Sequence, residues 1–231
     1  MTRLVLLFVL ASAISLWAQI PKNFVSGACN TGAKSCRVYP PSNWSSGATL
    51  ITFSHWTNQS VTVTSVTDPG GDKFTALTPQ INFDTNEATQ FFICTKANNS
   101  FSNSVIWSYS GSIGVYDVVD AFEISGTNTV NPVDVILSGT GDLSPMRIGP
   151  SSATAFANEL ILGLFVTNST GSNPITVGPG YTRIGVDAST IAEYKTAPAG
   201  ATATITALQS NPYPYVGLLL GIVPKGARTP N

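Results

Sequence analysis

Apolar and polar residues alternate along most of this chain. A two-residue alternation rich in valine, isoleucine, threonine and aromatic residues is typical of β-strands with one buried face. Two other segments, 159–166 and 215–223, are almost continuously apolar, which predicts strands covered on both faces. The alternating pattern is clearest in segments 49–54, 60–68, 105–110, 181–187 and 201–208.

Glycine, proline, asparagine and serine clusters such as "DPGG", "GTGDLSP" and "NPYP" separate these segments. These residues favour turns, and we find no amphipathic helix of ten or more residues among them. The sequence therefore predicts an all-β fold, either an antiparallel sandwich or a barrel. The chain length fits a single domain of this class.

The first eighteen residues have the layout of a secretory signal peptide. A short basic start precedes the apolar run "LVLLFVLASAISLWA", which is short for a membrane span and ends in small residues. We expect cleavage after Ala18, with Ala13 as the alternative, and no transmembrane anchor. The predicted division is a signal peptide (1–18), a leader (19–48), a sandwich domain (49–224) and a short tail (225–231). The expected location is extracellular, with the cell surface as an alternative.

Charge is sparse and balanced. Only 10% of residues are charged, with 11 Lys and Arg against 12 Asp and Glu, so the formal net charge is −1. A protein that neutralises nucleic-acid phosphates needs a basic surface, and nothing in this composition supplies one. We therefore expect no nucleic-acid partner.

Three cysteines and one histidine limit redox and metal chemistry. The polar segment "NTGAKS" between Cys29 and Cys36 can close a small loop, so we predict a disulfide between them. Cys94 lies in the apolar run "TQFFICTK" and is expected to be a free, buried thiol. No metal and no cofactor are expected.

The stretch "SVTDPGGDKFTAL" (65–77) is predicted to be a hairpin turn between two strands. Gly70 and Gly71 can supply a positive φ, Pro69 suits a reversal, and Asp68 can accept backbone amide hydrogens in an Asx turn. The alternative is a calcium loop that uses Asp68 and Asp72. Calcium needs six to eight oxygen ligands, so it would require further donors such as Asp84 or Glu87.

Several motifs occur in an order that resembles a recurrent module of exported, mostly uncharacterised bacterial proteins. After the 65–77 stretch come "DAFEISGTNTVNPVDV", "TAFANELILGLF", "GPGYTRI" and "YVGLLLGIV". The module has a "VTDxxGNxY" hairpin, an "EYSG…NPLD" segment, an "ANELLFG" strand and a "GxGFT" segment. The resemblance covers roughly 50–223 and departs at Ile124, where the module tends to have tyrosine. It implies a jelly-roll-like β-sandwich and no established catalytic residues.

Three carboxylates lie close together in "YDVVDAFEIS". In a strand, Asp117 and Glu123 would share one face and Asp120 would lie on the other. Two carboxylates across a cleft could serve glycoside hydrolysis, but we favour a structural role for Glu123. His55 has no nucleophile elbow nearby and no acid partner that the sequence identifies, so a catalytic triad is not expected.

Aromatic residues offer the remaining candidate site. Trp44 and Trp56 have polar neighbours and are the predicted surface positions for stacking sugar rings, whereas Trp107 reads as core. The sequence thus predicts a non-enzymatic module that binds polysaccharide or a cell-surface glycan. The alternatives are a self-assembling structural subunit of an extracellular assembly and, with less support, a glycoside hydrolase.

Overall fold

The computed structural model describes residues 19–84, 86–98, 104–114, 117–168, 174–187 and 189–227. The expected signal peptide, residues 1–18, lies outside this part of the chain. All regular elements of the described residues are strands, numbered β1 to β17 along the chain. The prediction of an all-β, antiparallel sandwich-like single domain is confirmed.

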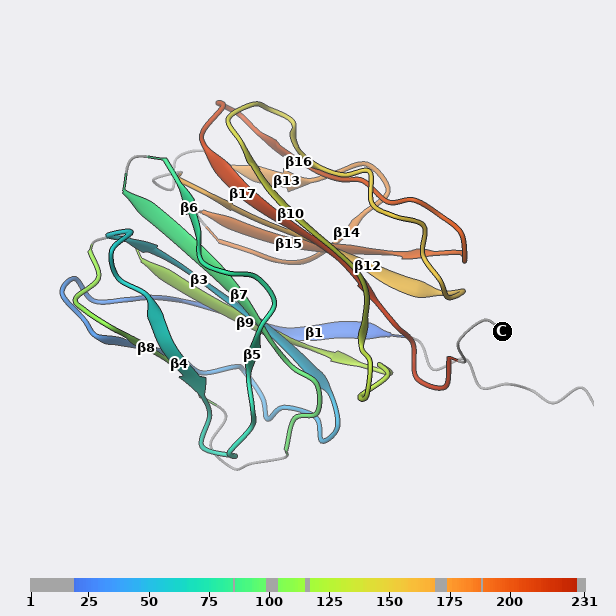
Figure 1. The fold of residues 1–231 in the computed structure, drawn as a ribbon, viewed down its shortest axis with the longest axis horizontal. Helices are drawn as coiled ribbons and strands as arrows, with labels where there is room; N and C mark the ends of the chain where they lie inside the picture. Colours follow the sequence, from blue (N-terminus) through green and yellow to red (C-terminus); the bar gives the residue numbers. More distant parts are fainter. Residues whose placement is uncertain are drawn as a thin grey trace, which may run out of the picture.

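The strands form four antiparallel sheets, stacked face to face (Figure 1). The two larger sheets lie in the middle. The six-stranded sheet contains β1 (Ile20–Ala28), β9 (Val118–Ser125), β3 (Thr49–Thr57), β7 (Glu87–Cys94) and β5 (Thr75–Ala76), with β6 (Ile81–Phe83) also paired to β7. The five-stranded sheet contains β10 (Val133–Gly141), β17 (Tyr215–Ile222), β12 (Glu159–Thr167), β15 (Thr190–Ala197) and β14 (Thr182–Val186).

A three-stranded sheet covers the outer face of each central sheet. The first packs on the six-stranded sheet and contains β2 (Ser35–Val38), β8 (Val105–Tyr109) and β4 (Val63–Thr67). The second packs on the five-stranded sheet and contains β11 (Met146–Ile148), β16 (Ile205–Gln209) and β13 (Ile175–Val177). The molecule therefore has four layers, where a simple sandwich has two.

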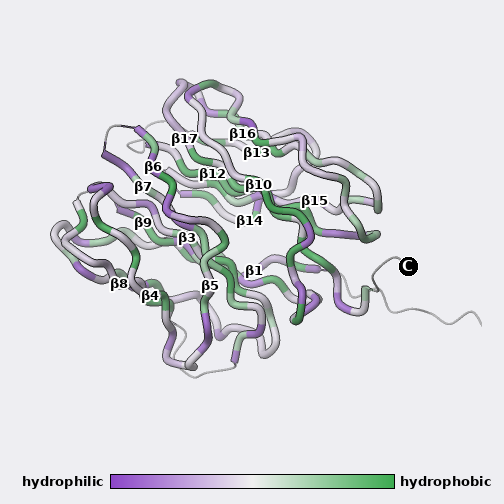
Figure 2. Tube along the Cα trace, viewed as in Figure 1, coloured by the Kyte–Doolittle hydropathy of each residue, from purple (hydrophilic) through white to green (hydrophobic). Residues whose placement is uncertain are grey.

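This layering explains the two hydrophobic patterns of the sequence. All residues of β12 and β17 are buried, because each strand has a sheet on either side, as the sequence predicts. In β9, Val119 and Ala121 face the β2–β8–β4 sheet, while Phe122 and Ile124 face the five-stranded sheet. Figure 2 shows apolar residues concentrated along the inner strands β12 and β17.

The segment predicted as a leader is part of the sandwich, so the boundary at residue 48 is wrong. β1 pairs with β9 and β2 pairs with β8. The alternation of apolar and polar residues in β1 is interrupted, which hid this strand in the sequence. The pairing register shifts between Lys22 and Val25, and Asn23 between them has a φ of 56°. The predicted tail is also held at its start, where the Lys225 amide donates to the Gly126 carbonyl at 2.8 Å.

The predicted hairpin around "DPGG" is also wrong, although its turn chemistry is present. Asp68 Oδ1 accepts the Asp72 amide at 2.7 Å, and Gly71 has a φ of 75°. However, β4 pairs with β8 whereas β5 pairs with β7, so this turn carries the chain from one sheet to the next. Turn residues specify a change of direction, but they do not specify which strand becomes the partner.

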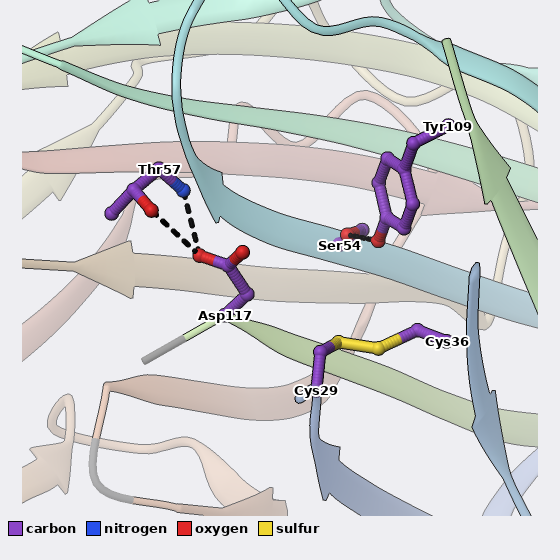
Figure 3. The surroundings of a disulfide bond; sticks show 6 residues. All are labelled: Cys29, Cys36, Ser54, Thr57, Tyr109 and Asp117. Carbon is purple, nitrogen blue, oxygen red and sulfur yellow. Dashed lines mark hydrogen bonds between the residues drawn. A yellow bond between two sulfur atoms is a disulfide. The ribbon is translucent and has the colours of Figure 1, made fainter. Parts of the chain in front are cut away.

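The predicted disulfide is confirmed. Cys29 and Cys36 have Cα atoms 5.5 Å apart and connect the end of β1 to β2 (Figure 3). The bond joins the six-stranded sheet to the β2–β8–β4 sheet. Cys94 is free and buried, as expected, and desolvation raises the pKa of its thiol to about 11.

We expect the double variant Cys29→Ser/Cys36→Ser to lose about 2 kcal/mol of unfolding free energy, because the crosslink restricts the unfolded chain. Urea titration followed by tryptophan fluorescence would measure this loss. Cys94→Ala provides the comparison without a crosslink. Labelling of two cysteines per chain by a thiol reagent in the native protein would contradict the disulfide. The free thiol of Cys94 is buried and should be labelled only after unfolding.

Candidate functional site

The two tryptophans predicted to bind sugar are in the core, so their expected exposure is wrong. Trp44 is 1% exposed and Trp56 is fully buried. Trp56 Nε1 donates to the Val61 carbonyl at 3.0 Å, and its ring lies 5.8 Å from that of Tyr109. Polar neighbours in sequence misled the prediction. Those of Trp56 point to the opposite face of β3, whereas Trp44 lies in the loop before β3 and packs into the core. Trp107 is buried, as expected.

Asp117 and Glu123 are fully buried, and each holds a loop in place. Asp117 Oδ1 accepts the Thr57 amide at 2.7 Å and the Thr57 hydroxyl at 3.2 Å (Figure 3). Burial raises the pKa of Asp117, and these hydrogen bonds oppose that effect. Glu123 Oε2 accepts the Ser45 amide at 2.5 Å, and its Oε1 lies 3.3 Å from the Lys22 ammonium. Both carboxylates are therefore bound within the fold.

His55 has an acid partner that the sequence did not reveal. Its Nε2 lies 3.1 Å from Glu87 Oε2, and its ring lies 5.4 Å from the ring of Phe83. The register of β3 on β7 places the two residues near the same end of neighbouring strands. Both side chains are nearly inaccessible to solvent, so this pair connects β3 to β7 at one end of the sheet.

The oxygen donors considered for a calcium loop do not come together. Glu87 pairs with His55, and Asp84 contacts Asn168, whereas Asp68 and Asp72 form their own buried pair. Desolvation and then the proximity of Asp68 raise the pKa of Asp72 to about 6, against the hydrogen bond from the Asn98 amide. Within the described ranges, no three acidic, histidine or cysteine side chains are grouped so as to hold a metal ion.

Two further buried carboxylates, Glu159 and Glu193, lie in the five-stranded sheet. Glu193 Oε2 accepts the Gly178 amide at 2.9 Å, which joins β15 to the loop after β13. Desolvation raises the pKa of Glu193 to about 7. Desolvation and then the neighbouring Asp134 also raise the pKa of Glu159 to about 7. Sequence reasoning missed both residues: Glu159 is the first residue of the mainly apolar β12, and Glu193 lies in the mixed strand β15, where no local pattern marks it.

A groove of about 910 Å³ opens at one end of the six-stranded sheet. Residues 45–48, Lys96 and residues 125–129 line it, together with 225–227 and Ile20. Its polar side chains are hydroxyls, the Asn128 amide and the ammonium groups of Lys96 and Lys225. The described lining residues include no carboxylate. Such a surface suits a ligand rich in hydroxyl groups, neutral or negatively charged.

Strand register brings these distant segments together. Thr49 lies opposite Ile124, and Leu50 lies opposite Cys94, so the loops flanking β3, β7 and β9 meet at one end. Backbone hydrogen bonds then join the walls, from Gly47 N to Ala97 O at 2.8 Å and from Lys225 N to Gly126 O at 2.8 Å. No local motif in the sequence marks this groove, because the five segments that line it are far apart along the chain.

Glu123, on β9, stabilises the part of the groove wall that contains Ser45. It accepts the Ser45 amide, while Lys22 donates to Ser45 Oγ at 3.0 Å. Gly47 next in the wall has a φ of 76°, a conformation that favours glycine. The candidate site is therefore preformed by contacts of its own loops with the sheet.

Comparison with known proteins identifies no relative: no family model, no curated protein and no solved structure matches this chain. The resemblance to an exported bacterial module therefore stays a prediction. Across the described residues, the structure contains no helix long and apolar enough to cross a membrane.

We expect the protein to be more stable at pH 4.5 than at pH 8. In the unfolded chain a Glu side chain has a pKa of about 4.3. Where folding raises this pKa, the folded state keeps the proton up to a higher pH than the unfolded state does. The stabilisation is complete below the unfolded pKa and is lost as pH rises to about 7, the folded value of Glu193 and Glu159.

Glu193→Gln should reduce the difference in unfolding free energy between pH 4.5 and pH 8 by roughly 2 kcal/mol. Urea titrations at both pH values measure it, with the exposed Asp142→Asn as the control that keeps the wild-type difference. Equal stability at both pH values in the wild type would contradict the assignment.

Proposed function

We propose that this protein is an exported, non-catalytic glycan-binding module whose site is the groove at the end of the six-stranded sheet. The observation that carries the proposal is the chemistry of the groove lining. Hydroxyl and amide groups can exchange hydrogen bonds with sugar hydroxyls, and two ammonium groups can donate to sugar carboxylates or sulfates. This replaces the tryptophan platform that the sequence predicted.

The size of the groove supports binding of a small segment of a chain. Its volume is near the upper end of the roughly 300–1,000 Å³ range of ordinary ligand sites. The disulfide supports export, because such bonds persist mainly in oxidising compartments.

The non-catalytic part of the proposal rests on how the carboxylates are used. Glycoside hydrolysis needs a pair of carboxyl groups that reach the substrate from two sides. Asp117 and Glu123, the pair considered from sequence, are fully buried and bind backbone amides. Their loss is expected to unfold loops and not to remove a chemical step.

A glycan array with the purified mature protein tests the proposal, with neutral, uronate-containing and sulfated polysaccharides as probes. We expect saturable binding to at least one glycan class. The double variant Lys96→Ala/Lys225→Ala should weaken it at least about tenfold, because charge-assisted hydrogen bonds contribute about 1.5–3 kcal/mol each.

Lys34→Ala is the matched control, because it removes an exposed ammonium outside the groove lining. Its affinity should equal that of the wild type. Absence of binding to every glycan, or equal binding by the double variant, would reject the groove as the site. Release of reducing sugar during the assay would reject the non-catalytic assignment.

A structural subunit of an extracellular assembly is the second candidate, and strand β10 favours it. β10 is an edge of the five-stranded sheet, and on it Ile136 is 45% exposed and Leu137 is 36% exposed. A long apolar edge strand can pair with a strand of another chain. Size-exclusion chromatography of the same sample should show a monomer for the glycan module. Concentration-dependent assemblies, lost in Ile136→Lys, would favour the subunit instead.

A further inference from the structure

Tyr39 is an exposed aromatic residue in a protein that buries its predicted sugar-binding tryptophans. It follows β2 directly and is 63% exposed. Arg37 holds the ring in place: its Nη1 donates to the Tyr39 hydroxyl at 3.2 Å, and its guanidinium carbon lies 5.9 Å from the ring centre. Both side chains point to solvent, because Cys36 and Val38, which alternate with them, are buried. An exposed ring that is already positioned loses little entropy when a ligand stacks on it.

The chain leads from Tyr39 back along β1 to the groove. Just before Tyr39, Val38 lies against Gly27 of β1, where a side chain would collide with it. At the other end of the segment, the Lys22 ammonium donates to Ser45 Oγ at 3.0 Å, and Ser45 is part of the groove wall. Gly27 and Lys22 are separated by about 17 Å along β1, at roughly 3.3 Å per residue. A few sugar rings in a row can bridge such a distance.

The surface between Tyr39 and the groove carries positive charge. The segment between β2 and β3 contains no acidic residue, and the nearby Glu123 is fully buried. Lys22 forms an ion pair with Glu123, but its side chain remains 48% exposed. Arg37 has the uncharged residues Ile106 and Thr67 as its neighbours across the outer sheet. This surface therefore continues the positive charge that two lysines give to the groove.

We propose that Tyr39 and Arg37 form a second subsite of the groove, which binds a uronate residue of an acidic polysaccharide. The chain would pass from the groove over the wall at Ser45, beside the Lys22 ammonium. This inference rests on the glycan-binding function proposed above, and it adds the class of the ligand and the direction in which it extends.

Each group of the subsite has a counterpart on a uronate ring. The Tyr39 ring offers an apolar face to the C–H face of the sugar and a hydroxyl at its polar end. The Arg37 guanidinium uses one donor on that hydroxyl and keeps further N–H donors, which can bind a carboxylate in a bidentate manner. A neutral sugar could stack on the ring, but it would leave the guanidinium and the Lys22 ammonium without a counter-charge.

Calorimetric titration of the mature protein with size-fractionated oligosaccharides tests the proposal. The probes are the tetra- and octasaccharides of galacturonate and of alginate, with isomaltooctaose as the neutral chain. A tetrasaccharide can occupy the groove alone, whereas an octasaccharide can also reach Tyr39. We expect at least one uronate octasaccharide to bind about tenfold more tightly than isomaltooctaose, the effect of one charge-assisted hydrogen bond.

Arg37→Ala should weaken binding of that octasaccharide about tenfold. Tyr39→Ala should weaken it about fivefold, the effect of leaving roughly 40 Å² of apolar surface exposed to water. Neither variant should change the affinity for the tetrasaccharide, because the groove is intact. Tyr39→Phe keeps the ring and should bind within about twofold of the wild type. The matched controls are Arg183→Ala and Leu143→Ala, which remove an exposed cation and an exposed apolar side chain elsewhere.

Wild-type octasaccharide affinity in Tyr39→Ala and Arg37→Ala would overturn the subsite, and the groove would still stand if Lys96→Ala/Lys225→Ala binds weakly. Equal affinity for isomaltooctaose and both uronate octasaccharides would overturn the acidic class of ligand. Weaker tetrasaccharide binding in Tyr39→Ala would also overturn the subsite, since the substitution would then act on the groove itself. Absence of binding to every probe and every arrayed glycan would reject the proposed function together with its subsite.

Discussion

The face-to-face contact between the six-stranded and five-stranded sheets is the interaction on which the rest of the structure depends. Ile51, Phe53 and Phe91 on one side meet leucines of β12 and β17 on the other, all fully buried. Removal of one such leucine side chain from a core typically costs about 2–5 kcal/mol. Because both central sheets are also covered on their outer faces, every polar group that enters them must find a partner inside the protein. The chain has only 12 acidic residues, and the contacts of the buried ones therefore show which loops and sheets these side chains hold together.

The buried acids follow one rule: each lies where a sheet meets a loop or another sheet. Glu193 holds the loop after β13, Asp117 holds Thr57 at the end of β3, and Glu123 holds Ser45 before β3. A carboxylate that accepts backbone amides fixes a loop that has no regular partner strand. The cost is desolvation, which appears as raised pKa values for Glu193 and Asp117. Stability and loop position are thus set by the same groups.

The sequence predicted many of the strands but not their pairing, and it assigned β1 and β2 to a leader. Alternation predicted β3 and β8, and continuous apolar runs predicted the doubly covered β12 and β17. The turn at Asp68 was also readable, because Asx-turn chemistry is local. Which strand lies beside which depends on contacts across the whole chain, so β5 could not be assigned to β7 from its own residues. The same limit misplaced Trp44 and Trp56, and it hid a groove formed by five separate segments of the chain.

Strand β9 connects the interface between the two central sheets to the candidate groove. Asp120 points from one face of β9 toward the five-stranded sheet, while Glu123 points from the other face toward the loop that carries Ser45. The strand is hydrogen-bonded to β1 on one side and to β3 on the other, so it moves only with the whole six-stranded sheet. Phe122 and Ile124, which pack β9 against the five-stranded sheet, therefore also help to hold Glu123 in position. Because Glu123 supports a groove wall, stabilising the interface between the sheets would lower the entropy that the groove loses when a ligand binds.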